Sequence, residues 1–231
     1  MARPLSTAVL LLGILAAAGC ATARLAPARP VIVLRQPPHN RMLVDRETIR
    51  LTFADAARIV GQPCTCAAAG FQVARAGLAA LSPDGPAVRG ELRLVAGRDH
   101  ATSDVVAFLV GADRRADPDR ATYVVDPDLS PRPGPWRYIL ADPARRRAVE
   151  IVYDKAKLMP EPLRSRLREI EEKGERGEAT PAERALFRRE MRRMVRLLLD
   201  PAASRAYITV HPLPWPDFAR RYPALAAADH D

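Results

Sequence analysis

The sequence predicts an α+β fold in which helices pack on a mixed, mostly antiparallel sheet, with a helical pair at the C-terminal end. Three observations support this prediction. Hydrophobic residues recur with a helical period in some segments and alternate in others. The elements follow the order helix, strand, helix and then three strands, a segregation that is typical of α+β domains. The chain of 231 residues is 48% hydrophobic, which is enough for a substantial core.

Two helices are predicted at the start of this domain. Residues 52–61 have Thr52 in the N-cap position, Asp55 three residues later and Gly61 as a stop signal, so they form a short helix. Residues 66–82 form a longer one, because apolar side chains recur on one face before a Pro-Asp-Gly turn. That face comprises Phe71, Ala74, Leu78 and Leu81.

The predicted sheet begins at residues 91–97, where leucines alternate with polar residues. A helix capped by Thr102 or Ser103 and closed by Gly111 follows it. Three further strands are expected at residues 121–126, 136–140 and 148–154, and a turn-forming "ADPARRR" joins the last two.

The predicted C-terminal pair consists of residues 161–174 and a second helix that opens with a capping box, Thr180 with Glu183. A last short strand is expected at residues 206–214. The second helix has an apolar stripe that should face the core, made of Phe187, Met191, Met194, Val195 and Leu198. It also has a face of arginines that should be solvated, made of Arg184, Arg188, Arg189, Arg192, Arg193 and Arg196.

The first nineteen residues differ in kind from the rest. Arg3 precedes an apolar run that is too short for a membrane span and ends in small residues, as an export signal does. The run ends in Ala17-Ala18-Gly19-Cys20, which fits a bacterial lipobox, so lipidation of Cys20 is expected. Plain secretion is the alternative. The expected organisation is a signal peptide at 1–19, a lipid anchor and Pro-rich tether at 20–45, the α+β core at 46–158, and a helical hairpin and tail at 159–231.

The net charge of the chain indicates which classes of binding partner to expect. The formal net charge is +9, and loss of the signal peptide with Arg3 leaves +8. For an exported, periplasmic or cell-envelope protein, such a charge favours the membrane surface or an anionic envelope polymer, and nucleic acid is not expected. A homo-oligomer remains open.

The chemistry-bearing residues fall at two predicted helix starts. Cys64 and Cys66 precede the long helix, and Asp99, His100 and Asp104 lie where a strand leads into the next helix. Helix N-termini favour anions and lower the pKa of a cysteine there. Three interpretations of the cysteine pair remain open from its spacing: a metal ligand pair, a redox disulfide, or two small structural residues.

A resemblance favours the metal. The segments "GQPCTCAAAGFQVARAGLAAL", "GRDHATSDVVAFLVGA", "RRRAVEIVYD" and "GERGEATPAERALFRREMRRMVRLLLD" occur in the order seen in the FmdE-like domain family, whose name comes from a component of formylmethanofuran dehydrogenase. The resemblance covers about residues 52–210. Gly61, Cys64, Gly70 and Phe71 match its first motif, and Asp99 and Asp104 match its second. The chain departs from the family at Gln62, Thr65 and Ala101, where the family has His, Pro and Cys.

The resemblance implies an α+β core and a metal bound between the two motifs. Here Cys66 and His100 lie near the lost ligands, so a rearranged site is expected. Its predicted ligands are Cys64, Cys66 and His100, with Asp99 or Asp104 as a ligand or as a group that orients one. Zinc is the expected ion.

Three functions therefore follow as hypotheses. The first is a lipid-anchored FmdE-like protein that binds a transition metal for metal handling or metal-assisted chemistry. The second is a periplasmic thiol/disulfide redox protein that uses Cys64 and Cys66. The third is a non-catalytic envelope module whose arginine face holds an anionic partner. Whether the protein is an enzyme, and on which small molecule it acts, stay open.

Overall fold

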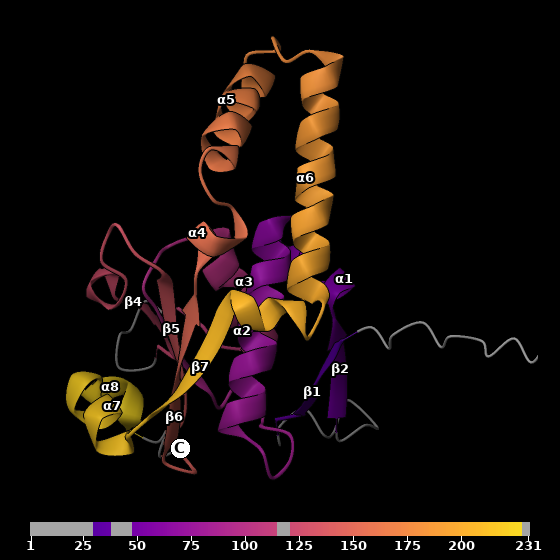
Figure 1. The fold of residues 1–231 in the computed structure, drawn as a ribbon. Coiled ribbons are helices and arrows are strands. Elements are labelled where there is room, and N and C mark those ends of the chain that lie inside the picture. Colours follow the sequence, from indigo (N-terminus) through magenta and orange to yellow (C-terminus); the bar gives the residue numbers. More distant parts are fainter. Residues whose placement is uncertain (1–29, 38–47, 115–120, 228–231) are drawn as a thin grey trace, which may run out of the picture.

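The computed structural model describes residues 30–37, 48–114 and 121–227. Within these ranges the chain forms eight α-helices, a five-strand mixed sheet and a separate two-strand hairpin (Figure 1). The predicted α+β class, the order of its elements and its mostly antiparallel sheet are confirmed. None of the helices in these ranges combines the length and the apolar character that crossing a membrane requires.

The sheet has the strand order β4-β3-β5-β6-β7. The β3–β4 pair is parallel and the other three pairs are antiparallel. The strands are β3 (Arg93–Ala96), β4 (Tyr123–Val125), β5 (Trp136–Asp142), β6 (Arg147–Tyr153) and β7 (Ile208–Leu213). They correspond to the five strands that the sequence predicts.

Both faces of the sheet are covered, as alternation along β5 shows. Tyr138 and Leu140 belong to the larger core, whereas Ile139 and Ala141 belong to the smaller one on the opposite face. Helices α2 (Thr65–Leu81) and α3 (Ala101–Val110) build the larger core. The short helices α7 (Trp215–Arg221) and α8 (Pro223–Ala226) cover the smaller one, and no pattern in the sequence predicted them.

Residues that the sequence assigns to the tether contribute to the fold. Strand β1 (Val31–Arg35) pairs antiparallel with β2 (Thr48–Thr52). It is a strand because Ile32 and Leu34 point to one side and are buried in the larger core, so this part of the tether is a folded element. The next helix, α1 (Phe53–Ile59), begins with the predicted capping box of Thr52 and Asp55.

Helices α5 (Leu163–Glu175) and α6 (Pro181–Leu199) form an arm that projects beyond the sheet (Figure 1). The short α4 (Lys155–Leu158) leads into α5, and α6 returns to the body. The predicted capping box at Thr180 is confirmed. Met194 and Leu198 of α6 and Leu167 of α5 are buried in the larger core. The rest of the apolar stripe of α6, made of Phe187, Met191 and Val195, packs against that core but is only partly buried.

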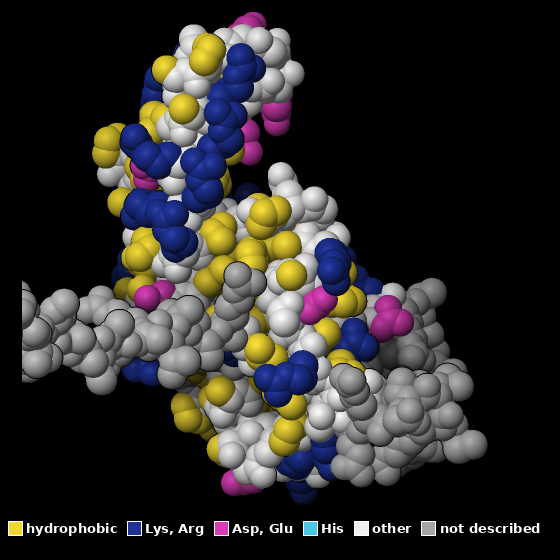
Figure 2. Space-filling view, turned by 90° about the vertical axis from the view of Figure 1, so that its right-hand side faces the viewer, with side chains coloured by type: hydrophobic (Ala, Val, Ile, Leu, Met, Phe, Trp, Pro, Cys, Tyr) yellow, Lys and Arg dark blue, Asp and Glu magenta, His cyan; other side chains and the backbone are white. Residues whose placement is uncertain are grey.

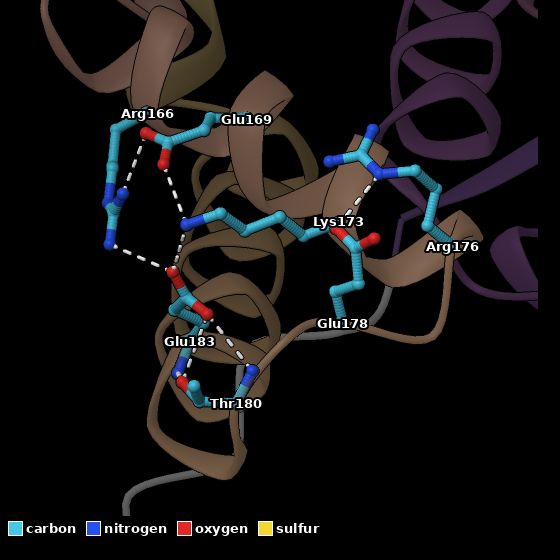
Figure 3. Close-up of polar contacts among 7 residues, drawn as sticks. All are labelled: Arg166, Glu169, Lys173, Arg176, Glu178, Thr180 and Glu183. Atoms are coloured by element: carbon cyan, nitrogen blue, oxygen red, sulfur yellow. Dashed lines mark hydrogen bonds and ion pairs between the residues drawn. The ribbon is translucent and has the colours of Figure 1, made fainter.

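An ion-pair network joins the two helices at the end of the arm (Figure 3). Glu183 of α6 accepts hydrogen bonds from Lys173 at 2.9 Å and from Arg166 at 3.2 Å. Glu169 pairs with the same two cations, at 2.8 and 2.7 Å. Single exposed pairs contribute little to stability, but a shared network fixes the orientation of the helices that carry it. The network therefore sets how α5 and α6 face each other.

Candidate thiol site in a basic cleft

Cys64 is the N-cap residue of α2. Its backbone is extended, with φ −114° and ψ 175°, and its Sγ accepts a hydrogen bond from the Ala67 N–H at 3.5 Å. The thiol thus occupies the place where a Ser or Thr hydroxyl usually caps a helix. Gly61, at φ +75°, ends the preceding helix and lets the chain turn into this position.

Cys66 lies in the first turn of α2. Both cysteines are half-buried, and neither forms a disulfide. Cys66 is the more deeply buried of the two, so Cys64 is the sulfur that solvent and ligands meet first.

His100 is the N-cap residue of α3, so the predicted caps, Thr102 and Ser103, are wrong. The reason is local: the ring Nδ1 accepts a hydrogen bond from the Thr102 N–H at 3.1 Å, which an imidazole does as well as a hydroxyl. Because Nδ1 accepts, the proton of the neutral ring lies on Nε2. The ring also makes an edge contact with Trp136, with centroids 4.7 Å apart.

The N-termini of α2 and α3 meet because a glycine allows it. A Cβ at Gly70 would lie 2.7 Å from the Thr102 carbonyl oxygen and from the Val105 Cβ, which is closer than side chains tolerate. Two helix N-termini therefore point their partial positive charges at one place. Lys155 of α4 adds a full charge beside them and stacks over the Trp136 ring at 5.1 Å.

The two thiols differ strongly in pKa because of their surroundings. A hydrogen bond from the Cys66 thiol, helped by the Ala67 N–H, lowers the pKa of Cys64 to about 6 against the opposing effect of burial. The same hydrogen bond, together with burial and the negative charge on Cys64, raises the pKa of Cys66 well above its usual range. Burial and the charge of Lys155 lower the pKa of His100. Near neutral pH the site therefore holds a Cys64 thiolate, a Cys66 thiol and a neutral imidazole.

The thiols and His100 line one side of a cleft of about 740 Å³, and the arm lines the other. The cleft is strongly basic, since six cations and one carboxylate, Glu171, line it. The cations are Lys155, Arg164, Arg168, Arg188, Arg192 and Arg196. Figure 2 shows Lys and Arg side chains gathered along the projecting arm. The lining also includes apolar side chains: Met159, Leu167, Phe187, Met191 and Val195.

The two aspartates of the predicted metal site lie elsewhere. Asp99 pairs with Arg114 at 2.9 Å, and Asp104 lies 3.9 Å from the same guanidinium. Arg114 also donates a hydrogen bond to the Tyr123 hydroxyl at 2.6 Å. Both carboxylates are largely exposed, and neither lines the cleft. The structure thus brings together Cys64, Cys66 and His100 but leaves the aspartates outside.

The donors that do meet do not make a zinc site as they are arranged. Within residues 30–37, 48–114 and 121–227 there is no group of three or more His, Cys, Asp or Glu placed to hold a metal ion. A histidine that binds zinc through one ring nitrogen normally donates the other N–H to an acceptor. The His100 Nδ1 accepts from the Thr102 N–H instead, and a metal on Nε2 would require Nδ1 to give up that bond and donate to the Thr102 hydroxyl, which lies 3.1 Å away. Zinc binding stays a prediction, as does lipidation of Cys20, which lies outside the described residues.

The cleft itself was not predicted from the sequence. The arginines of residues 184–196 were expected to form one solvated face, but the structure divides them. Arg188, Arg192 and Arg196 line the cleft, whereas Arg189 and Arg193 pair with Glu190. The signal was present in the sequence, because residues four apart share a helix face.

Comparisons with known proteins identify no relative. No family model matches the chain, and no match appears among the curated proteins or among the solved structures.

Proposed function

We propose that this protein exchanges thiols and disulfides with a partner, with Cys64 as the attacking sulfur and Cys66 as the resolving sulfur. One observation carries the proposal: two free thiols lie two residues apart at a helix N-terminus, and the more accessible one opens into a cleft large enough for a substrate. A thiolate is the nucleophile in such exchange, and helix N-termini with nearby cations favour it.

The reaction balances without any other reactant. The Cys64 thiolate attacks one sulfur of a partner disulfide, forms a mixed disulfide and releases the first partner thiolate. The Cys66 thiol then gives its proton to solvent, and its sulfur attacks Cys64, which releases the second partner thiolate. The cysteine pair is oxidised to a disulfide, and the partner disulfide is reduced to two thiols. The reverse sequence oxidises a partner dithiol.

The spacing permits the internal disulfide. Residues two apart have Cα atoms no more than about 7 Å apart, and disulfides need about 4.4–6.8 Å. The surroundings of Cys64 stabilise the thiolate, which belongs only to the reduced form. Stabilisation of the reduced form makes the disulfide a stronger oxidant, so the pair is better suited to donating disulfides than to removing them.

The test counts thiols in a Cys20→Ser background, where Cys64 and Cys66 are the only thiols. The reduced protein is mixed with an excess of a small aromatic disulfide, and the released thiol is measured together with protein mass. We expect about two thiols per chain and an unmodified mass less two hydrogens for the parent, by the balance given above.

The two single variants assign the roles. Cys66→Ser should release one thiol and stop as a mixed disulfide, because nothing resolves it. Cys64→Ser should react far more slowly, because Cys66 is the more buried of the two thiols and burial alone still raises its pKa. A Cys64→Ser protein that reacts as fast as Cys66→Ser would contradict the assigned roles.

The proposed location is the cell envelope, with the chain anchored by lipid on Cys20. The lipobox-like sequence at residues 17–20 supports it, and an oxidising compartment is where a disulfide exchanger would work. Fractionation of cells that express the full chain tests the anchor. The parent should sediment with membranes and Cys20→Ser should not; equal distribution of the two would contradict the anchor.

Metal binding by an FmdE-like site is the second candidate. It is favoured by the convergence of two cysteine sulfurs and one imidazole on the same cleft. The site would need the proton of the neutral His100 ring to lie on Nδ1, where the Thr102 hydroxyl 3.1 Å away can accept it, so that Nε2 is free to bind the metal. Elemental analysis of the purified chain tests this candidate: about one zinc per chain that is absent from Cys64→Ser would support it, and no metal in either protein would contradict it.

A further inference from the structure

The cleft carries more positive charge than the described residues neutralise. Arg164 pairs with Glu161 at 2.7 Å. The other five cations of the lining have no carboxylate within ion-pair distance among the described residues. Cations gathered with one sign in a concave site attract an anionic ligand and speed its arrival.

The spacing of three of these cations indicates the shape of the ligand. Arg188, Arg192 and Arg196 are spaced four residues apart on α6, so the Cα atoms of successive arginines are separated by about 6 Å along the helix axis. In an extended polypeptide, alternate side chains share one side and are separated by about 6.6 Å. Carboxylates at every second position of an extended segment would therefore meet successive arginines of α6.

An apolar stripe runs parallel to the basic one. Phe187, Met191 and Val195 each precede one of the three arginines by one residue, and all three line the cleft while remaining half-exposed. A peptide that presented acidic side chains to the arginines would cover this stripe with its backbone and other side chains. An inorganic anion could not use the apolar surface, so a polypeptide fits the lining better.

We infer that the cleft between the arm and the N-termini of α2 and α3 is a docking groove for an extended acidic segment of a partner protein, which delivers its cysteine sulfur to Cys64. The inference rests on the proposed thiol exchange and deepens it by naming the substrate class. The partner carries acidic residues at alternate positions next to a disulfide-bonded cysteine. Its charge complements the six cations of the cleft.

The experiment uses three synthetic peptides whose single cysteine is disulfide-bonded to the same neutral chromophoric thiol. Their other positions alternate alanine with Asp, Asn or Lys. The second-order rate of chromophore release by the Cys20→Ser, Cys66→Ser protein measures attack by Cys64 alone. We expect the Asp peptide to react at least ~10-fold faster than the Asn peptide at low salt, and the advantage to collapse near 1 M salt, where the Debye length is about 3 Å.

Two triple variants of equal net charge separate docking from overall charge. Arg188→Gln with Arg192→Gln and Arg196→Gln should abolish the preference for Asp, so that the Asp and Asn peptides react with this variant at similar rates. The control changes three arginines that do not line the cleft, Arg189→Gln, Arg193→Gln and Arg220→Gln, and should retain the preference.

The outcomes distinguish this inference from the proposed function. Equal rates for all three peptides, or loss of preference in both triple variants, would overturn the docking groove but leave thiol exchange standing. Failure of every peptide to react would overturn thiol exchange itself. Addition of anionic phospholipid vesicles provides a last outcome. If a low concentration of these vesicles suppresses the preference for Asp in the parent protein, the inference is overturned, because the groove would then bind a membrane surface.

Discussion

Replacing Cys66 by alanine should change the acidity of Cys64, because the hydrogen bond from the Cys66 thiol is the largest cause of its low pKa. With a pKa of about 6, roughly 90% of Cys64 is thiolate at pH 7; at its ordinary value of 9.0, about 1% would be. Full loss of the stabilisation would thus cut the thiolate population about 90-fold. The Ala67 N–H remains in the variant, so this value is an upper limit.

The reaction rate changes by less, since a more basic thiolate is a better nucleophile. With a Brønsted slope of about 0.4–0.5, three pKa units increase nucleophilicity by roughly 15- to 30-fold. Cys66→Ala should therefore react only about 3- to 6-fold more slowly than the parent pair at pH 7, and faster above pH 9. The midpoint of the pH–rate curve is the sharper observable.

The assay is alkylation by iodoacetamide from pH 4 to pH 10 in the Cys20→Ser background, where each Cys66 variant has Cys64 as its only thiol. Cys66→Ser is the matched comparison, because a serine hydroxyl can still donate to the Cys64 sulfur. The serine variant should keep its midpoint near 6 and the alanine variant should move upward. Identical midpoints, or a serine variant that titrates near 9, would refute the hydrogen bond as the cause.

Three further predictions concern stability. The free energy of unfolding should rise between pH 6 and 9, because Cys64 is ionised there only in the folded state, and it should fall above pH 9, because Cys66 stays protonated there only in the folded state. Denaturant melts at each pH measure both changes, and Cys64→Ser should remove the rise. Gly70→Ala should destabilise by about 1–3 kcal/mol in urea, because overpacking against α3 exceeds the gain of about 1 kcal/mol in helix propensity. Gly174→Ala, with open space around its Cβ, should stabilise instead. Glu183 has a pKa lowered to about 2, chiefly by the backbone N–H of its capping box, so the start of α6 should fray as pH falls from 4.5 toward 2 in hydrogen exchange; Glu183→Gln should fray already at neutral pH and change little over that range.

Local signals in the sequence were sufficient for most of the fold. The capping boxes at Thr52 and Thr180 mark helix starts through hydrogen bonds that involve only residues three apart. The alternation along residues 148–154 marks a strand whose two sides face different layers. Strand β1 was missed because the prolines on both sides of it, and its separation along the chain from the predicted core elements, resemble a linker. Its burial depends on packing against residues far along the chain.

The site was predictable only in part, for a similar reason. The positions of Cys64 and His100 at helix N-termini follow from local patterns, and their meeting depends on the close approach that Gly70 allows. Asp99 was expected beside the cysteines, but its carboxylate forms an ion pair with Arg114 instead, and no pattern in the sequence predicts that pair. The cleft depends on the angle of the arm, which tertiary contacts set.

The most direct test of the central claim is a redox titration of the Cys64–Cys66 pair in glutathione buffers, with a zinc chelator present and then with zinc added. Thiol exchange predicts one reversible two-electron transition between dithiol and disulfide, at a potential that the chelator does not change. Thiols that stay reduced in oxidised buffer, or a transition that one equivalent of zinc abolishes, would contradict the proposal and return the site to metal binding.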